Sequence, residues 1–260
     1  MFEGELRRRG AVFARSDGDT YEVVLGDDRV TVTLENVARD LERDEDPGRI
    51  VAFVDSVLGT LVPLPSWVAA RESVYWTIEN GAHDLHGVVH EVLTDTVVRI
   101  LVHADFEAGR IRWLTPKSIA DWNVEPADVS AAAYQNLDRA LASAELHVEG
   151  DGEVSLGMMV MPDRPSESLK ASLILAPSFE RFVERRLGWP VLAIVPCRDY
   201  VYLIAEKDAS LLTAEMGAQA LNEYRTSGYP ITLDALRISS NGIESIGRFP
   251  EEGELPGEPA

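Results

Sequence analysis

The chain has 260 residues, 45% hydrophobic and 26% charged, which is typical of a globular protein with one sizeable core or two small ones. Asp and Glu number 44 against 24 Lys and Arg, a formal net charge of −20. Because phosphate contacts dominate nucleic-acid affinity, this charge argues against nucleic acids and anionic membranes as partners. The single cysteine, with no visible signal peptide or membrane-spanning run, leads us to expect a cytoplasmic protein.

Residues 1–62 are expected to form a small unit, a β-meander combined with helices. A short helix over residues 2–9 precedes three strand-like segments with turn compositions between them, which are residues 11–15, 20–25 and 30–34. Apolar residues at helical spacing then predict two helices. The second begins at Asp46-Pro47, where a capping side chain is followed by proline at the first helical position.

Pro63 and Pro65 mark a linker over residues 63–69, and residues 70–248 are expected to form the main domain. Up to residue 96 the pattern is hard to interpret. Beyond it, strands are predicted at residues 97–104, 110–114, 145–148, 154–160, 231–239 and 243–248. Helices are predicted after Pro126, after the capping residue Ser178 and after the capping residue Asp208. We therefore expect an α+β fold, in which the N-terminal unit is followed by a larger, mostly antiparallel sheet with helices on one side.

The segment 191–205, VLAIVPCRDYVYLIA, is expected to supply the two central strands of the main domain. Two apolar runs flank Pro196-Cys197-Arg198-Asp199, which has the composition of a turn. At the other end of the pattern, residues 249–260 are rich in glutamate, glycine and proline. They are expected to form a disordered acidic tail.

Several short motifs follow one another before a closing hairpin. They are Trp122, Ala133 to Leu137, Ala171 to Leu175, Val195-Pro196-x-x-Asp199 and Tyr229-Pro230-Ile231-Thr232. With the N-terminal meander, these motifs resemble the YtpQ-like bacterial proteins, a domain of unknown function, over roughly residues 10–248. The resemblance implies a cytoplasmic bacterial protein and no known activity. An acidic and a basic residue of that family correspond here to Lys170 and Leu173, so no role passes to these positions.

Four of the five histidines lie within residues 83–103, and His83, His86 and His90 are the candidate metal ligands. On a helix these three positions would share a face and could ligate zinc. However, the segment contains Gly81, Gly87 and several β-branched residues, which disfavour a helix, and it lacks the H-E-x-x-H order of zinc hydrolases. An exposed polar region without a metal is the alternative interpretation, and we favour it.

Three further residues are candidates for a binding site. Arg198 and Asp199 could present a charged pair at the turn, although an Asp in a β-turn more often bonds its own backbone. Asn136 lies on the apolar face of its helix, where a buried amide is most often bonded to backbone. Cys197 has no histidine near it in sequence, so a bystander thiol is favoured over a nucleophile.

The sequence predicts a function only in outline. Common nucleotide-binding and esterase motifs are absent, and no catalytic constellation is evident. We therefore expect a non-catalytic binding or adaptor protein, with protein partners or self-association and no cofactor. The alternative is a metal-assisted hydrolase that uses residues 83–105. A concave pocket collecting His86, His90, His103 and Asp105 would favour that alternative.

Overall fold

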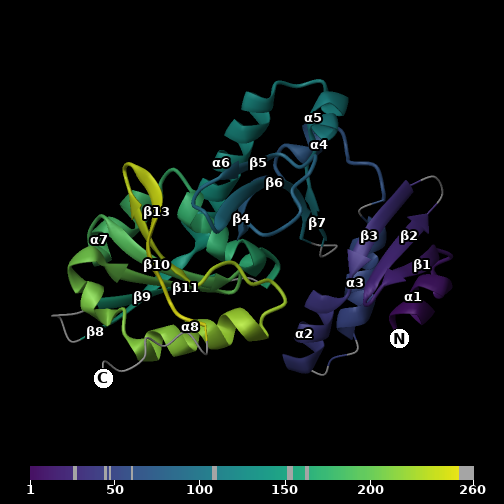
Figure 1. Cartoon of the computed structure of the whole chain (residues 1–260). Helices are drawn as coiled ribbons and strands as arrows, with labels where there is room; N and C mark the ends of the chain where they lie inside the picture. The colour runs from purple at the N-terminus through teal and green to yellow at the C-terminus, as the bar shows by residue number, and fades with distance from the viewer. Residues whose placement is uncertain are drawn as a thin grey trace.

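The computed structural model describes residues 1–25, 28–43, 46, 48–59, 61–106, 110–150, 155–161 and 164–251. It has the predicted α+β fold, in which a small N-terminal sheet is followed by larger antiparallel sheets with helices (Figure 1). None of the helices within these ranges is long and apolar enough to cross a membrane.

The N-terminal unit matches the predicted meander. Its elements in chain order are α1 (Phe2–Arg8), β1 (Val12–Asp17), β2 (Thr20–Leu25), β3 (Asp28–Thr33), α2 (Glu35–Arg43) and α3 (Gly48–Gly59). The three strands pair in the order β1-β2-β3, and a core that includes Phe2, Leu6 and Val54 joins the sheet to α1 and α3. Asp46 caps α3 as predicted, because its Oδ1 accepts a hydrogen bond from the Gly48 N–H at 2.8 Å. Pro47 lies outside the described residues.

The stretch that was hard to interpret contains β4 (Val74–Asn80), a strand absent from the prediction. It joins β5 (His90–Val92), β6 (Val97–Asp105) and β7 (Arg110–Trp113) in a sheet where β6 pairs with the other three. Thr77 and Glu79 interrupt the apolar pattern of β4, yet both are buried. Nothing in the local pattern indicates that distant residues would satisfy these two polar side chains.

Three helices accompany this sheet: α4 (Trp67–Ala70), α5 (Pro116–Trp122) and α6 (Pro126–Ser143). Residues 63–66 have no regular structure, so the predicted linker is shorter than expected and α4 begins within it. The long α6 was predicted and packs on β4. The short α5 was not predicted, although Thr115 and Ser118 form a capping box and Pro116 follows the cap.

The second large sheet consists of β8 (Glu145–Gly150), β9 (Ser155–Val160), β10 (Val191–Cys197), β11 (Tyr200–Ala205), β12 (Asp234–Ser239) and β13 (Gly242–Arg248). Within the described residues its strand order is β13-β12-β10-β11-β9-β8, all antiparallel. The prediction that 191–205 supplies the two central strands is therefore confirmed. Strand β8 lies at one end of the sheet.

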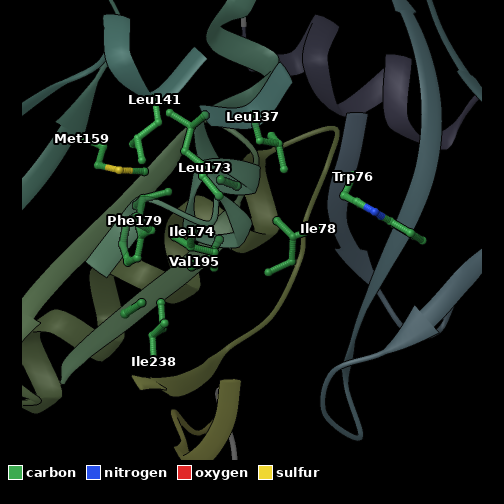
Figure 2. Packing of buried hydrophobic residues seen from close by; sticks show 14 of the residues in the cluster. Trp76, Ile78, Leu137, Leu141, Met159, Leu173, Ile174, Phe179, Val195 and Ile238 are labelled. Atoms are coloured by element: carbon green, nitrogen blue, oxygen red, sulfur yellow. The ribbon is translucent and has the colours of Figure 1, made fainter. Parts of the chain in front are cut away.

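Helices cover both faces of this second sheet, where one covered face was predicted. Val191, Ala193 and Val195 pack in a core shared with the 3₁₀ segment η1 (Arg164–Leu175), α6 and α7 (Phe179–Leu187). Leu192 and Ile194 point the other way, toward α8 (Ala214–Thr226). Figure 2 shows the shared core, with side chains from β4, α6, η1, α7 and the second sheet packed together. Since β10 is apolar at every position, it is buried on both faces.

Three local predictions need correction. Ser178 precedes α7 but does not cap it, because its N–H and hydroxyl both donate to Asp138 Oδ1. Asp208 lies in η2 (Glu206–Leu211), where it accepts from the Ser155 N–H, and Thr213 caps α8 instead. Phe249, placed in the tail by the prediction, is buried in the α8 core. Residues 252–260 of the predicted tail lie outside the described residues.

Candidate functional site

Arg198 turns inward and forms a buried ion pair with Glu79 of β4. Its Nη2 donates to Glu79 Oε1 at 2.6 Å, and the side chains are only 13% and 2% exposed. Burial lowers the pKa of Arg198, but the facing Glu79 carboxylate reverses this effect, so the net pKa is raised and Arg198 stays charged. Its guanidinium also lies over the Tyr229 ring, 4.4 Å from the centroid. The pair therefore links the two large sheets.

Asp199 faces the opposite way and does not pair with Arg198. The carboxylate is exposed, and within the described residues no hydrogen bond or ion pair engages it. The Asp199 backbone carbonyl instead accepts from Lys170 Nζ at 2.8 Å. The charged pair, the less favoured interpretation of this turn, is not formed, because Arg198 pairs with the buried carboxylate of Glu79. The favoured interpretation, a bond from the Asp199 side chain to its own backbone, is not seen among the described residues either.

Replacing Asp199 by Ala is expected to leave stability nearly unchanged. Within the described residues the exposed carboxylate makes no hydrogen bond or ion pair, and a substitution of this kind typically changes the free energy of unfolding by less than about 0.5 kcal/mol. Urea unfolding of the variant and the parent chain measures this. A loss above about 1 kcal/mol would show that the carboxylate supports the turn.

Asn136 also has an internal structural role. It is 2% exposed, and its Nδ2 donates to the carbonyls of Arg71 and Val74 at 3.0 and 2.7 Å. Its Oδ1 accepts from Arg139. The predicted bonding of a buried amide to backbone is confirmed, and it joins α6 to the chain between α4 and β4.

Other polar contacts join the first large sheet to η1 and to the second large sheet, and a further one supports Asp234 within the second sheet. Ser172 Oγ accepts from the Ile78 N–H at 3.1 Å, while Thr96 Oγ1 donates to Asp234 Oδ2 at 2.6 Å. Arg248 donates to the second Asp234 oxygen at 3.1 Å. Buried polar groups need such partners, because an unpaired one costs ~1–3 kcal/mol. The Arg198–Glu79 ion pair is therefore one of several polar contacts that hold the first large sheet against the rest of the domain.

The histidines do not converge on a metal site. All five lie within the described ranges, where no group of three or more His, Cys, Asp or Glu side chains could hold a metal ion. His83 packs edge-on against Trp113, the His86 N–H bonds to Asp84, and His90 Nδ1 lies 2.9 Å from the Val88 carbonyl oxygen. The pKa of His83 is lowered, mainly by burial. The Glu79 carboxylate acts to raise this pKa, and the Arg198 guanidinium acts to lower it.

His90 and His103 point to opposite faces of their sheet. His90 is the cross-strand partner of Ile100, so their side chains share a face. His103 lies three residues further along β6 and therefore points to the other face. Asp105 forms an ion pair with Arg110 across β6 and β7, as the predicted cross-strand pairing requires. The residues of the hydrolase alternative are thus dispersed.

Cys197 is fully buried in the second sheet. Burial raises the pKa of its thiol, although the Asp199 backbone N–H acts in the opposite direction. A buried thiol with a raised pKa is a poor nucleophile. This favours the bystander interpretation.

Two hollows flank Phe182 of α7. The larger, about 690 Å³, lies beside β8 and is lined by residues 144–149 with Phe182 and Arg186. The second, about 450 Å³, lies between α6 and α7 and is lined by Asp138, Leu141, Ala142, Ser178, Arg181, Phe182 and Arg185. The surface of the two hollows together, which share Phe182, is called the β8 groove. None of the histidines of residues 83–103 lines it.

Small and apolar residues hold α7 against this end of the sheet. Gly157 of β9 lies beneath Leu187 of α7 and Leu146 of β8. A Cβ added there would be 2.8 Å from Leu187 Cδ1 and 3.1 Å from Leu146 Cδ1. A larger residue at position 157 would therefore require the Leu187 and Leu146 side chains to shift. The glycine lets these two side chains pack closely over β9.

The outer edge of β8 is open to the groove. On its inner side β8 pairs with β9, and among the described residues no strand pairs with its outer side. The Leu146 carbonyl accepts a hydrogen bond from the Arg186 guanidinium, so it points away from β9. In an antiparallel strand the N–H and C=O of one residue point the same way, and the direction alternates. The backbone groups of Leu146 and Val148 therefore face the groove.

Sequence reasoning missed Glu79 and the arginines of α7. A single glutamate within the apolar run of β4 was the available signal for a buried charge that needs a partner. Arg181, Arg185 and Arg186 lie within six residues of a strongly acidic chain, which was the signal for a basic surface.

Comparisons of the chain with models of known protein families, with curated proteins and with solved structures found no match. The resemblance to the YtpQ-like proteins stays a prediction.

Proposed function

We propose that the protein is a non-catalytic binding or adaptor protein of the bacterial cytoplasm, which holds an extended segment of a protein partner along strand β8. One observation carries the proposal: consecutive residues of an edge strand, 144–149, line an open groove. Strand edges with unpaired backbone groups accept an added strand from another chain. The groove supplies side-chain contacts beside that edge.

The dispersal of the other candidates supports binding over catalysis. Arg198 and Asn136 are engaged by internal partners, and His86, His90 and His103 do not meet. A metal-assisted hydrolase would need those histidines in one pocket. The net charge of −20 favours a polypeptide over a nucleic acid as the partner.

The Val148 N–H, one of the two that face the groove, offers a direct test of strand addition at β8. Val148→Pro removes this donor but keeps the pairing with β9, since proline is tolerated at strand edges. Val148→Ala is the matched control, because it also loses the valine packing but keeps the N–H. We expect peptides selected from a random library on the Val148→Ala chain to bind the Val148→Pro chain at least about tenfold more weakly.

Binding is measured by fluorescence anisotropy, after circular dichroism has established that both variants are folded. If no peptide is enriched, or if the selected peptides bind both variants equally, strand addition at β8 is wrong.

A further inference from the structure

We infer that the segment bound in the β8 groove is acidic, with carboxylates at alternate positions that face α7. This inference rests on the proposed function and specifies its partner. The basic residues are Arg181, Arg185 and Arg186, all exposed and all lining the groove.

These arginines are unusual in a chain with 44 acidic and 24 basic residues. Many of the other arginines pair with carboxylates, as Arg99 does with Glu91 and Arg237 with Glu206. In the part of the chain that the structure describes, Arg181 and Arg185 have neither an ion pair nor a hydrogen bond. They stand four residues apart on α7, where two like charges repel. A carboxylate-bearing ligand would relieve this repulsion.

Three acidic residues also line the two hollows, and they differ in where they point. Asp138 lines the second hollow, where its negative charge offsets part of the charge of the two arginines; its Oδ1 accepts two hydrogen bonds from Ser178, at 2.8 and 2.6 Å. Glu149 lines the first hollow and points to the same face of β8 as Glu145. Glu145 lies within 3.0 Å of His147 and, like it, points to the face opposite Leu146, away from α7. The α7 side of the groove therefore presents positive charge around the half-buried Phe182.

The geometry of strand addition determines the spacing of the carboxylates in the bound segment. Side chains of an added strand alternate between the two faces of the sheet, so every second side chain faces α7. Positions 181 and 185, and likewise 182 and 186, are neighbours on the helix surface. A segment with Glu or Asp at every second position would meet the arginines, with its backbone against Leu146 and Val148.

Arg186 connects strand addition at the β8 edge with the recognition of carboxylates. Its guanidinium now occupies the Leu146 carbonyl, an acceptor that an added strand would use. When the partner's N–H takes this acceptor, Arg186 is released next to the incoming carboxylates. An acidic segment can compensate this exchange with a charge-assisted hydrogen bond, whereas a neutral segment cannot.

A second copy of this chain fits the edge less well. Pairing β8 with β8 about a two-fold axis would place both α7 helices on the same face of the joined sheet, next to each other. The two sets of arginines would then repel, and the chain's own β8 carries its glutamates on the other face. An acidic hetero-partner satisfies both observations.

The test uses two fluorescent eight-residue peptides, one with Glu and one with Gln at every second position, and Thr and Val between them. We expect the Glu peptide to bind at least about tenfold more tightly than the Gln peptide in low salt. Raising the salt concentration should reduce this difference in affinity, because salt screens the attraction between the arginines and the carboxylates. The double variant Arg181→Gln/Arg185→Gln should weaken the Glu peptide by about tenfold and leave the Gln peptide unchanged. The double variant Arg7→Gln/Arg8→Gln on α1 is the control for net charge and should have no effect.

The outcomes separate this inference from the proposed function. If both peptides bind equally and Val148→Pro abolishes both, strand addition stands and the acidic preference is overturned. If the Glu peptide binds through the arginines but Val148→Pro has no effect, the site attracts anions without adding a strand, and the docking geometry is wrong. If neither peptide binds while library-selected peptides do, the acidic preference is overturned alone.

Discussion

Replacing Glu79 by Leu is expected to destabilise the protein by about 3 kcal/mol, because it leaves the Arg198 guanidinium largely buried with no counter-charge. Replacing Arg198 by Met should cost a similar amount, since Glu79 is the more deeply buried partner. The double variant replaces both charges by apolar side chains and should recover much of this loss. Buried ion pairs are often matched or exceeded in stability by apolar residues of similar volume.

A double-mutant cycle of urea unfolding measures the coupling between the two residues. The control is Lys117→Met, which breaks an ion pair with Asp121 in which both side chains are exposed. This control should change the free energy of unfolding by less than about 0.5 kcal/mol. Additive losses in the cycle would mean that Glu79 and Arg198 do not act as a pair.

Asn136→Leu is expected to cost about 2 kcal/mol, because the carbonyls of Arg71 and Val74 lose their common donor. Leucine has the same branched outline as asparagine and suits the apolar face of α6, so no cavity is left, although its larger volume adds a cost of overpacking. Gln135→Leu on the exposed side of α6 is the matched control, with an expected change below about 0.5 kcal/mol. Chemical unfolding of the two variants under one condition gives the comparison. Equal losses of stability for Asn136→Leu and Gln135→Leu would mean that the hydrogen bonds from Asn136 to the Arg71 and Val74 carbonyls do not stabilise the fold.

Local patterns predicted much of the fold. The hairpin 191–205 has two uninterrupted apolar runs around a turn composition, and such runs predict a buried strand pair. The strands predicted at residues 231–239 and 243–248 form the hairpin of β12 and β13, and the Asn241-Gly242 turn between them places Gly242 at a φ of 111°. These features depend on residues that are close in sequence, which is why the pattern sufficed.

The candidate site could not be predicted as well. Glu79 and Arg198 are 119 positions apart, and neither local pattern indicates that they meet. Strand β4 was missed for the same reason, since its buried glutamate resembles an exposed position until the partner is known. Arg198 and Asp199 were expected to act together because they are adjacent. In the structure Arg198 pairs with the buried carboxylate of Glu79, while Asp199 is exposed at the turn.

The β8 groove depends on strand order, which hairpin patterns leave open. The sequence predicted both β8 and α7. It could not indicate that β8 ends the sheet or that α7 lies beside its open edge. Only that placement shows that Arg181, Arg185 and Arg186 lie near an open strand edge.

Amide hydrogen exchange of the chain with and without the Glu peptide tests the central claim most directly. We predict that the peptide slows the exchange of the Leu146 and Val148 amides, whose N–H groups face the groove, and leaves the amides of β13 at the other edge unchanged. At the same peptide concentration, the Leu146 amide should be less protected in the Val148→Pro chain than in the parent chain, because the variant binds the peptide more weakly. Protection centred on another surface, or none at β8 despite saturating peptide, would contradict the assignment of β8 as the binding edge.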